Sequence, residues 1–163
     1  MESLLKTLEW MLVAACIGSG MMAGLFLAFS SFIMKALSSL SAPNGIKAMQ
    51  AINRFIVRPS FLLVFFGTGI LCAASLLLGW NVLGASLWTA VAAAVTYIVG
   101  CLFATILFNV PLNNQLDAVD PESVEGQALW AHYLSRWTRW NHVRSIATLS
   151  STFLLVLSLV NLE

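Results

Sequence analysis

The fold is decided first by residues 10–34, which read WMLVAACIGSGMMAGLFLAFSSFIM and contain no charged side chain. A bilayer core about 30 Å thick is crossed by roughly 20 apolar residues in an α-helix, at a rise of about 1.5 Å each. This run is too long for the apolar part of a signal peptide and lacks the basic start of one. We therefore expect a retained membrane helix over about residues 8–37. Gly20 and Gly24, four apart in it, predict a close helix contact.

Three further apolar runs follow, over residues 60–79, 83–110 and 143–160. The first of these begins after Pro59, which suits the first turn of a helix because its missing N–H would have no partner there. Of the 163 residues, 60% are hydrophobic and 9% are charged, whereas soluble domains average about 25% charged residues. The predicted fold class is therefore all-α: an integral membrane four-helix bundle, one transmembrane domain in contact with the lipid bilayer.

The two longer connections between these runs are predicted to be helical as well. After Ser41-Ala42-Pro43-Asn44, apolar residues recur at helical spacing over residues 45–57. This pattern predicts an amphipathic helix that lies at the membrane interface between spans 1 and 2. In the second connection, an acidic turn over residues 117–126 is followed by a helix over about 127–142 that continues into span 4.

Lysine and arginine are distributed unevenly along the chain. One side of the bundle has only Lys6, whereas the two longer connections and the adjoining helix ends contain Lys35, Lys47, Arg54, Arg58, Arg136, Arg139 and Arg144. The positive-inside rule then places these connections in the cytoplasm and both termini outside it, in the inner (cell) membrane. A net charge of +1 provides no basic surface for nucleic acid, so no nucleic-acid partner is expected.

Several chemistries are disfavoured by what the spans contain. Cys16, Cys72 and Cys101 each stand alone, which argues against a disulfide framework, a zinc site and thiol–quinone exchange. No Asp or Glu lies deep in a span, which argues against a proton-coupled transporter. His132 and His142 fall on the outward face of their predicted helix, so no metal site is expected.

The last predicted helix has one unusual face. At 100° per residue, the positions within about 60° of Trp137 form a single stripe. That stripe contains Trp130, Tyr133, Trp137, Trp140, Asn141, Arg144, Thr148, Ser151 and Thr152. The opposite face, centred on Ile146, contains apolar residues that suit lipid. We therefore expect the stripe to face the interior of the bundle.

Arg144 is the central residue of this stripe. An arginine inside a span costs roughly 2.5–3.5 kcal/mol on insertion scales, so it should meet a ligand, water or side-chain acceptors. The alternative is that Arg144 extends to the lipid headgroups while the tryptophans form an interfacial aromatic belt. Asn141 favours an internal face, because an amide has no reason to share a lipid-facing stripe.

Two more polar clusters are expected at the same membrane depth. Asn109 and Asn113 are four apart at the end of the third span, with Pro111 between them, and Gln50 and Asn53 are neighbours on the amphipathic helix. Each amide could simply bond a neighbouring helix. Their convergence with Arg144 instead predicts donors around one bound oxygen.

These motifs resemble the anthrone oxygenase-like family of small four-span membrane proteins. The likeness rests on GLFLAF at 24–29, AMQAIN at 48–53, PSF at 59–61, the Asn-x-Pro-x-Asn motif at 109–113, and Trp137, Asn141 and Arg144. Fungal members are associated with oxidising anthrones to anthraquinones without an evident metal or flavin. The resemblance therefore implies an oxidoreductase, an oxygenase acting on a hydrophobic phenolic or anthrone-like substrate, with no cofactor.

Under this hypothesis the catalytic residues are Arg144, Asn141, Asn109 and Asn113, which would stabilise an enolate or phenolate oxygen. The substrate-binding residues are Asn53, Gln50, Trp137, Trp140 and Tyr133. No general base is identified. The alternatives are a non-catalytic membrane protein that binds or transports a small hydrophobic or anionic molecule, and a structural partner subunit. A homo-oligomer is compatible with the sequence.

Overall fold

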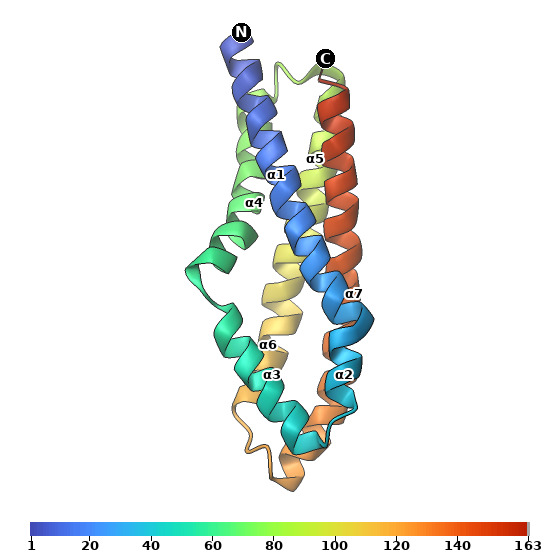
Figure 1. Cartoon of the computed structure of the whole chain (residues 1–163). Coiled ribbons are helices and arrows are strands. Elements are labelled where there is room, and N and C mark those ends of the chain that lie inside the picture. The colour runs from blue at the N-terminus through green and yellow to red at the C-terminus, as the bar shows by residue number, and fades with distance from the viewer. Residues whose placement is uncertain (163) are drawn as a thin grey trace.

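The computed structural model describes residues 1–162, in which every regular element is helical (Figure 1). Four helices are long and apolar enough to cross a membrane, namely Glu2–Ser38, Pro59–Gly79, Gly84–Asp117 and Val124–Val160. The prediction of an all-α membrane bundle is confirmed, and the chain is a multi-pass membrane protein in contact with the bilayer. Both termini lie at one end (Figure 1); we call the opposite end the distal end.

The first and third membrane helices are interrupted by π-helical turns. The first consists of α1 (Glu2–Ala28), η1 (Phe29–Ile33) and α2 (Met34–Ser38). The third consists of η2 (Gly84–Ser86), α5 (Leu87–Tyr97), η3 (Ile98–Phe103), η4 (Thr105–Asn109) and α6 (Val110–Asp117). Pro111 has no N–H for the carbonyl four residues earlier, which loosens the ladder where η4 ends.

The amphipathic helix α3 spans Ala42–Ile56 and leads into α4, Pro59–Gly79. It begins three residues earlier than expected, because Pro43 fits its first turn. The chain leaves the helix at Val57 and is extended at Arg58, as a residue before proline favours. This break produces the corner between α3 and α4 at the left of Figure 1.

The last helix, α7, runs unbroken over Val124–Val160. Its first turn is capped by the Ser123 hydroxyl, which accepts from the Gly126 N–H at 2.9 Å. Only glycine fits at position 126, because a Cβ there would lie 2.4 Å from the Asp120 carbonyl oxygen. The cap adds a turn before residue 127, where the helix was expected to start.

Near the termini, the helices pack around an aliphatic core. Leu8, Leu12 and Leu155 are fully buried there. Gly18 of α1 packs closely against α4, because a Cβ at position 18 would lie 2.0 Å from Thr68 Oγ1. The expected close contact at Gly20 and Gly24 was wrong, because a Cβ at Gly24 would have no atom within 4 Å and one at Gly20 only Thr152 Cγ2, at 3.8 Å.

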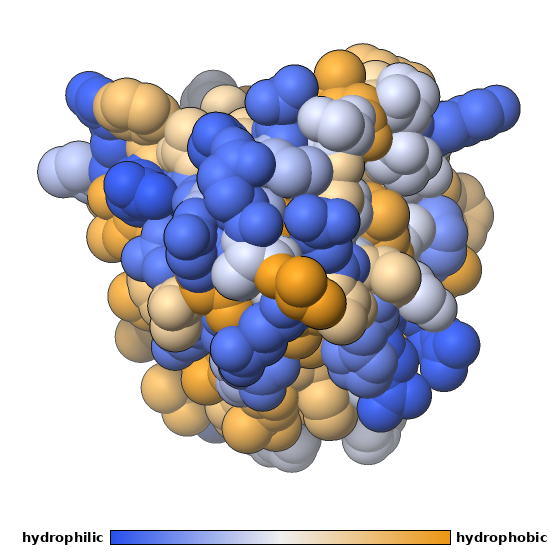
Figure 2. Space-filling view, turned by 90° about the horizontal axis from the view of Figure 1, so that it is seen from below, coloured by the Kyte–Doolittle hydropathy of each residue, from blue (hydrophilic) through white to orange (hydrophobic). Residues whose placement is uncertain are grey.

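The distal end is polar, whereas the sides of the bundle are apolar. Ile146, Leu149 and Phe153 on the side of α7 are each more than 60% exposed, as lipid-facing residues should be. Figure 2 shows hydrophilic side chains gathered over the distal end. Two ion pairs lie there, Lys47 with Glu122 and Arg54 with Asp117.

Candidate functional site

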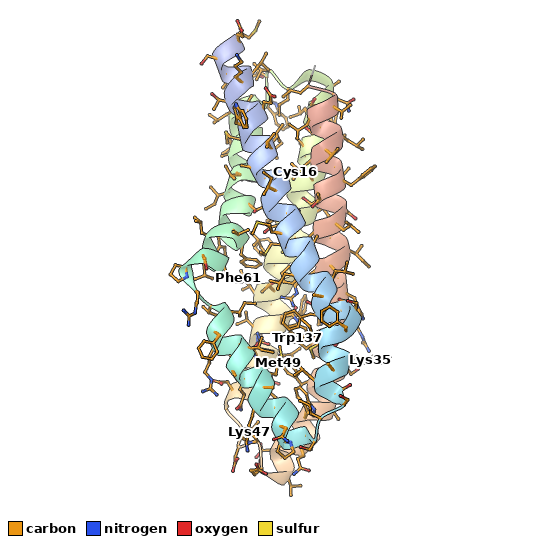
Figure 3. All side chains as sticks on the ribbon, in the orientation of Figure 1. Cys16, Lys35, Lys47, Met49, Phe61 and Trp137 are labelled. Carbon is orange, nitrogen blue, oxygen red and sulfur yellow. The ribbon has the colours of Figure 1, made fainter. Side chains whose placement is uncertain are left out.

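A cavity of about 290 Å³ lies in the distal half, between α1, α3, α4, the third membrane helix and α7. Figure 3 shows Trp137 between the helices, with Met49 on α3 and Phe61 on α4 nearby. Most of the wall is apolar and aromatic. Its polar members are Asn53, Thr105, Asn113 and Arg144, and its aromatic members are Phe26, Phe29, Phe61, Phe65, Phe66 and Trp137. The cavity is therefore apolar, with polar groups at a few points.

Arg144 is buried in this wall, with 5% of its surface exposed. Its Nη2 donates to Asn141 Oδ1 at 2.7 Å and its Nη1 to Thr105 Oγ1 at 3.3 Å, while its Nε has no hydrogen-bond partner. The guanidinium carbon lies 4.3 Å from the centre of the Phe26 ring and 5.1 Å from that of Trp137. The alternative in which Arg144 reaches the headgroups is excluded.

The charge of Arg144 is not balanced by a carboxylate. The ion pairs among residues 1–162 are both at exposed positions and involve other cations. A buried cation without a counter-ion is unfavourable unless neutral acceptors, water or an anionic ligand compensate it. Stacking between two aromatic rings supplies part of this compensation. The remaining imbalance makes the cavity suited to a negatively charged oxygen.

Asn141 holds the guanidinium in place. It is fully buried, and its Nδ2 donates to the Phe26 carbonyl and to Ser30 Oγ, both at 2.8 Å. These two bonds fix the amide with its oxygen toward Arg144. The Phe26 carbonyl lies just before the π turn Phe29–Ile33 and also accepts the backbone N–H of Phe29. Asn141 therefore positions Arg144, with both of its amide hydrogens occupied.

Asn113 orients two aromatic residues. Its Oδ1 accepts from the Tyr133 hydroxyl and from Trp137 Nε1, both at 2.8 Å. Asn113 lines the cavity, and its amide nitrogen forms no hydrogen bond with the described residues. Asn53, across the cavity on α3, has a buried Nδ2 without a partner. Two amides from different helices can thus serve as donors.

The other predicted site residues lie outside the cavity wall. Asn109 is fully buried and donates to the Trp137 carbonyl at 3.2 Å, whereas its Oδ1 is unpartnered. Gln50 donates to the carbonyls of Leu116 and Val119, at 2.9 and 3.1 Å, and so ties α3 to the end of α6. Both amides link helices, a common use of such residues in membranes.

Tyr133 and Trp140 also lie outside the wall. Tyr133 is fully buried; its hydroxyl donates to Asn113, and its ring stacks on that of Trp137 with ring centres 6.1 Å apart. Trp140 is half-buried and stacks on Phe108, with ring centres 3.6 Å apart. Its neighbour Phe108 is 38% exposed on the side of the bundle. The stripe is therefore narrower than expected at this level, because Trp140 lies at its margin.

Burial confirms the orientation of α7. Trp130, Trp137, Asn141, Thr148 and Ser151 are buried, whereas His132 and His142 are exposed. No cluster of three or more His, Cys, Asp or Glu side chains suited to a metal ion occurs in residues 1–162.

Sequence reasoning missed the aromatic wall and Ser30. Phe61 and Phe65, one turn apart on α4, stack with ring centres 5.4 Å apart. Ser30 Oγ accepts from Asn141 and also forms a hydrogen bond with Ser145 Oγ, with the two oxygens 3.0 Å apart. A serine pair at 30–31 in an otherwise apolar run was the available signal.

The chain was compared with known proteins. A family model described as anthrone oxygenase matches residues 61–154, which is more than half of the chain. The match includes Asn109, Asn113, Trp137, Asn141 and Arg144; it begins at residue 61, in α4, and so does not include α3. No curated protein and no solved structure gives a match.

Proposed function

The chain belongs to the anthrone oxygenase family, and from this premise we propose that it oxidises a planar phenolic or anthrone-like substrate with dioxygen. The observation that carries the proposal is Arg144, a buried cation without an acidic partner in the wall of an aromatic cavity. A ligand with an extended ring system and one anionic oxygen would satisfy both the rings and the charge.

The substrate's own chemistry supplies the electrons. An anthrone has an acidic C–H beside its carbonyl-conjugated rings, and loss of that proton gives an electron-rich enolate. The enolate passes one electron to dioxygen, and the resulting substrate radical and superoxide combine to form a C–O bond. After protonation, the hydroperoxide loses water and leaves a carbonyl. The methylene and dioxygen are thereby converted to a ketone and water.

The protein's part is to stabilise the anion and exclude water. Arg144 faces the enolate oxygen, and the amide nitrogens of Asn113 and Asn53 donate hydrogen bonds to it. Removing a single preorganised donor from a dry site costs about 3–4 kcal/mol of transition-state stabilisation. Trp137, Phe26 and the phenylalanines of α4 contact the rings. No Asp, Glu or His lines the cavity in the described chain. The proton therefore passes to water at the membrane surface before the anion is enclosed in the cavity.

The cavity opens sideways, which suits a substrate dissolved in the bilayer. Its wall includes Phe66 on α4 and Ile106 and Val110 on the third membrane helix, and these are 42%, 46% and 38% exposed. Apolar residues exposed on the side of a membrane bundle face lipid. We propose that the substrate enters between α4 and the third membrane helix.

We place the cavity on the cytoplasmic side of the inner membrane. Seven of the eight Lys and Arg residues lie in the distal half or beside it, and Lys6 alone lies near the termini. The positive-inside rule then leaves both termini outside the cytoplasm.

The test is oxygen-dependent turnover of 1,8-dihydroxyanthrone by the purified protein in nanodiscs, with the anthraquinone followed by absorbance. Under air we expect a rate above the spontaneous one, and one ¹⁸O atom from ¹⁸O₂ in the product carbonyl. Arg144→Gln should lose about 10²–10³-fold of the catalysed rate, whereas Arg136→Gln, an exposed cation on the same helix, should not.

Two outcomes would contradict the proposal. Turnover equal to the spontaneous rate, with saturable binding of 1,8-dihydroxyanthraquinone that requires Arg144, would identify a binding or transport protein instead. Equal rates in Arg144→Gln and wild type, with folding intact by circular dichroism, would show that the cavity is not the site.

A further inference from the structure

A second polar groove lies on the outside of the bundle, between the first membrane helix and α7. Its volume is about 500 Å³, and it is lined by residues of η1, α2 and α7. It shares no lining residue with the cavity around Arg144. Figure 3 shows Lys35, one of its members, on the outer side of α2, whereas Trp137 points between the helices.

The groove is basic and has no acidic residue in its wall. Lys35, Arg139 and His142 line it, all three exposed. In residues 1–162 neither Lys35 nor Arg139 forms an ion pair, whereas Lys47 and Arg54 across the distal end pair with Glu122 and Asp117. The two basic surfaces of the distal end therefore differ: the cations Lys47 and Arg54 are neutralised by carboxylates, whereas those of the groove are not.

Hydroxyl groups complete the wall. Ser135 and Thr138, one helical turn apart from Arg139 and His142, line the groove and form no side-chain hydrogen bond with the described residues. Free hydroxyls beside unpaired cations are the donors that a phosphate oxygen requires. The combination favours a phosphate over a carboxylate, because several donors on two helices can each take a different oxygen.

The groove lies at the headgroup level of the membrane. Lys35 follows the uncharged residues 10–34, while Arg139 and His142 precede the uncharged residues 145–162. Beyond the groove, toward the membrane centre, Phe32, Ile146 and Leu149 are 61–67% exposed and apolar. A phosphate in the groove would thus have a hydrophobic surface below it, along which acyl chains can lie.

From this juxtaposition we propose that the groove between α2 and α7 binds the phosphodiester of an anionic glycerophospholipid, such as phosphatidylglycerol. Basic pockets between membrane helices are suited to anionic lipid headgroups. A zwitterionic lipid fits less well, because its ammonium group would meet the Lys35 and Arg139 cations. This proposal does not depend on the oxidation proposed for the cavity.

The experiment is native mass spectrometry of the protein released from nanodiscs of equal parts phosphatidylglycerol and phosphatidylcholine. We expect the wild type to retain one phosphatidylglycerol in preference to phosphatidylcholine. In a Lys35→Gln/Arg139→Gln variant this preference should fall by roughly 25-fold, since each cation near an anionic headgroup contributes about fivefold. Lys35→Arg should retain it.

The matched control is Lys47→Gln/Arg54→Gln, which removes the same charge from the neutralised side and should bind lipid as the wild type does. Equal loss in both double variants would overturn the proposal, because net charge alone would explain it. Displacement of the lipid by millimolar inorganic phosphate would also overturn it, by identifying a site for soluble anions.

Discussion

The two halves of the bundle use the same helices in different ways. Near the termini, α1, α4, α5 and α7 pack fully buried leucines such as Leu12 and Leu155. Ser151 there donates across helices to the Ala93 carbonyl at 3.0 Å, and Ser86 Oγ is the one buried polar side-chain atom of this half, among the described residues, without a partner. In the distal half, π turns interrupt two of the helices, and buried polar atoms of Asn53, Asn109 and Arg144 have no partner. The terminal half is built for stability, and the distal half retains unsatisfied groups around a cavity.

The comparison predicts that stability and turnover can be separated by mutation. Leu155 is fully buried in the terminal core, so Leu155→Ala should lower the free energy of unfolding by about 2–5 kcal/mol. The turnover of 1,8-dihydroxyanthrone per folded molecule should stay at the wild-type value, because the cavity is remote. Unfolding in mixed detergent micelles measures the free energy of unfolding, and assays on the folded fraction measure the turnover per folded molecule.

Leu149→Ala is the control for this prediction, because Leu149 is 63% exposed on the lipid side of the same helix. It should change the free energy of unfolding little. A loss of turnover per folded molecule in Leu155→Ala would show that the two halves are coupled.

The positions of the helices and the inward face of α7 were predictable from the sequence, whereas the contacts of individual side chains were not. Hydropathy alone located four spans, and the period of α7 placed Trp137, Asn141 and Arg144 inside, because an unbroken helix follows its 3.6-residue repeat. The role of each amide was not predictable. Asn141 and Gln50 bond backbone carbonyls of other helices, and tertiary packing decides which carbonyl lies within reach of each amide.

The second prediction concerns the neutralisation of Arg144. Asn141→Asp would place a carboxylate where Oδ1 now accepts from Arg144 Nη2 at 2.7 Å. An internal counter-ion would compete with an anionic ligand, so the affinity for 1,8-dihydroxyanthraquinone should fall about 10-fold or more. Equilibrium titration by absorbance measures it. Asn161→Asp, the same change at the other end of α7, should leave the affinity unchanged; an unchanged affinity in Asn141→Asp itself would remove Arg144 from the binding site.

The third prediction tests the helix contact in the terminal half. Gly18→Ala would place a Cβ 2.0 Å from Thr68 Oγ1, so α1 and α4 must shift or Thr68 must rotate. Overpacking of this kind costs about 1–3 kcal/mol of unfolding free energy. Gly24→Ala, where a Cβ would have no neighbour within 4 Å, should leave the free energy of unfolding unchanged within experimental error. Thr68→Ala in the same chain should restore most of the loss; if it does not, the contact at Gly18 is not the cause.

The smallest effect on ligand affinity is expected for substitutions of Trp137 and Trp140. The helix period places both on one face of α7, but in the structure only Trp137 lines the cavity. Trp137→Phe keeps a ring against Arg144 but removes the Nε1–H that donates to Asn113 Oδ1 at 2.8 Å. Loss of one such hydrogen bond costs about 1 kcal/mol, or about fivefold in affinity for 1,8-dihydroxyanthraquinone. Trp140→Phe removes an indole that stacks on Phe108 outside the cavity, and its affinity should equal that of the wild type. A larger loss for Trp140→Phe than for Trp137→Phe would mean that the ligand binds on the lipid-facing side of α7, and it would assign function to the surface that this structure assigns to the bilayer.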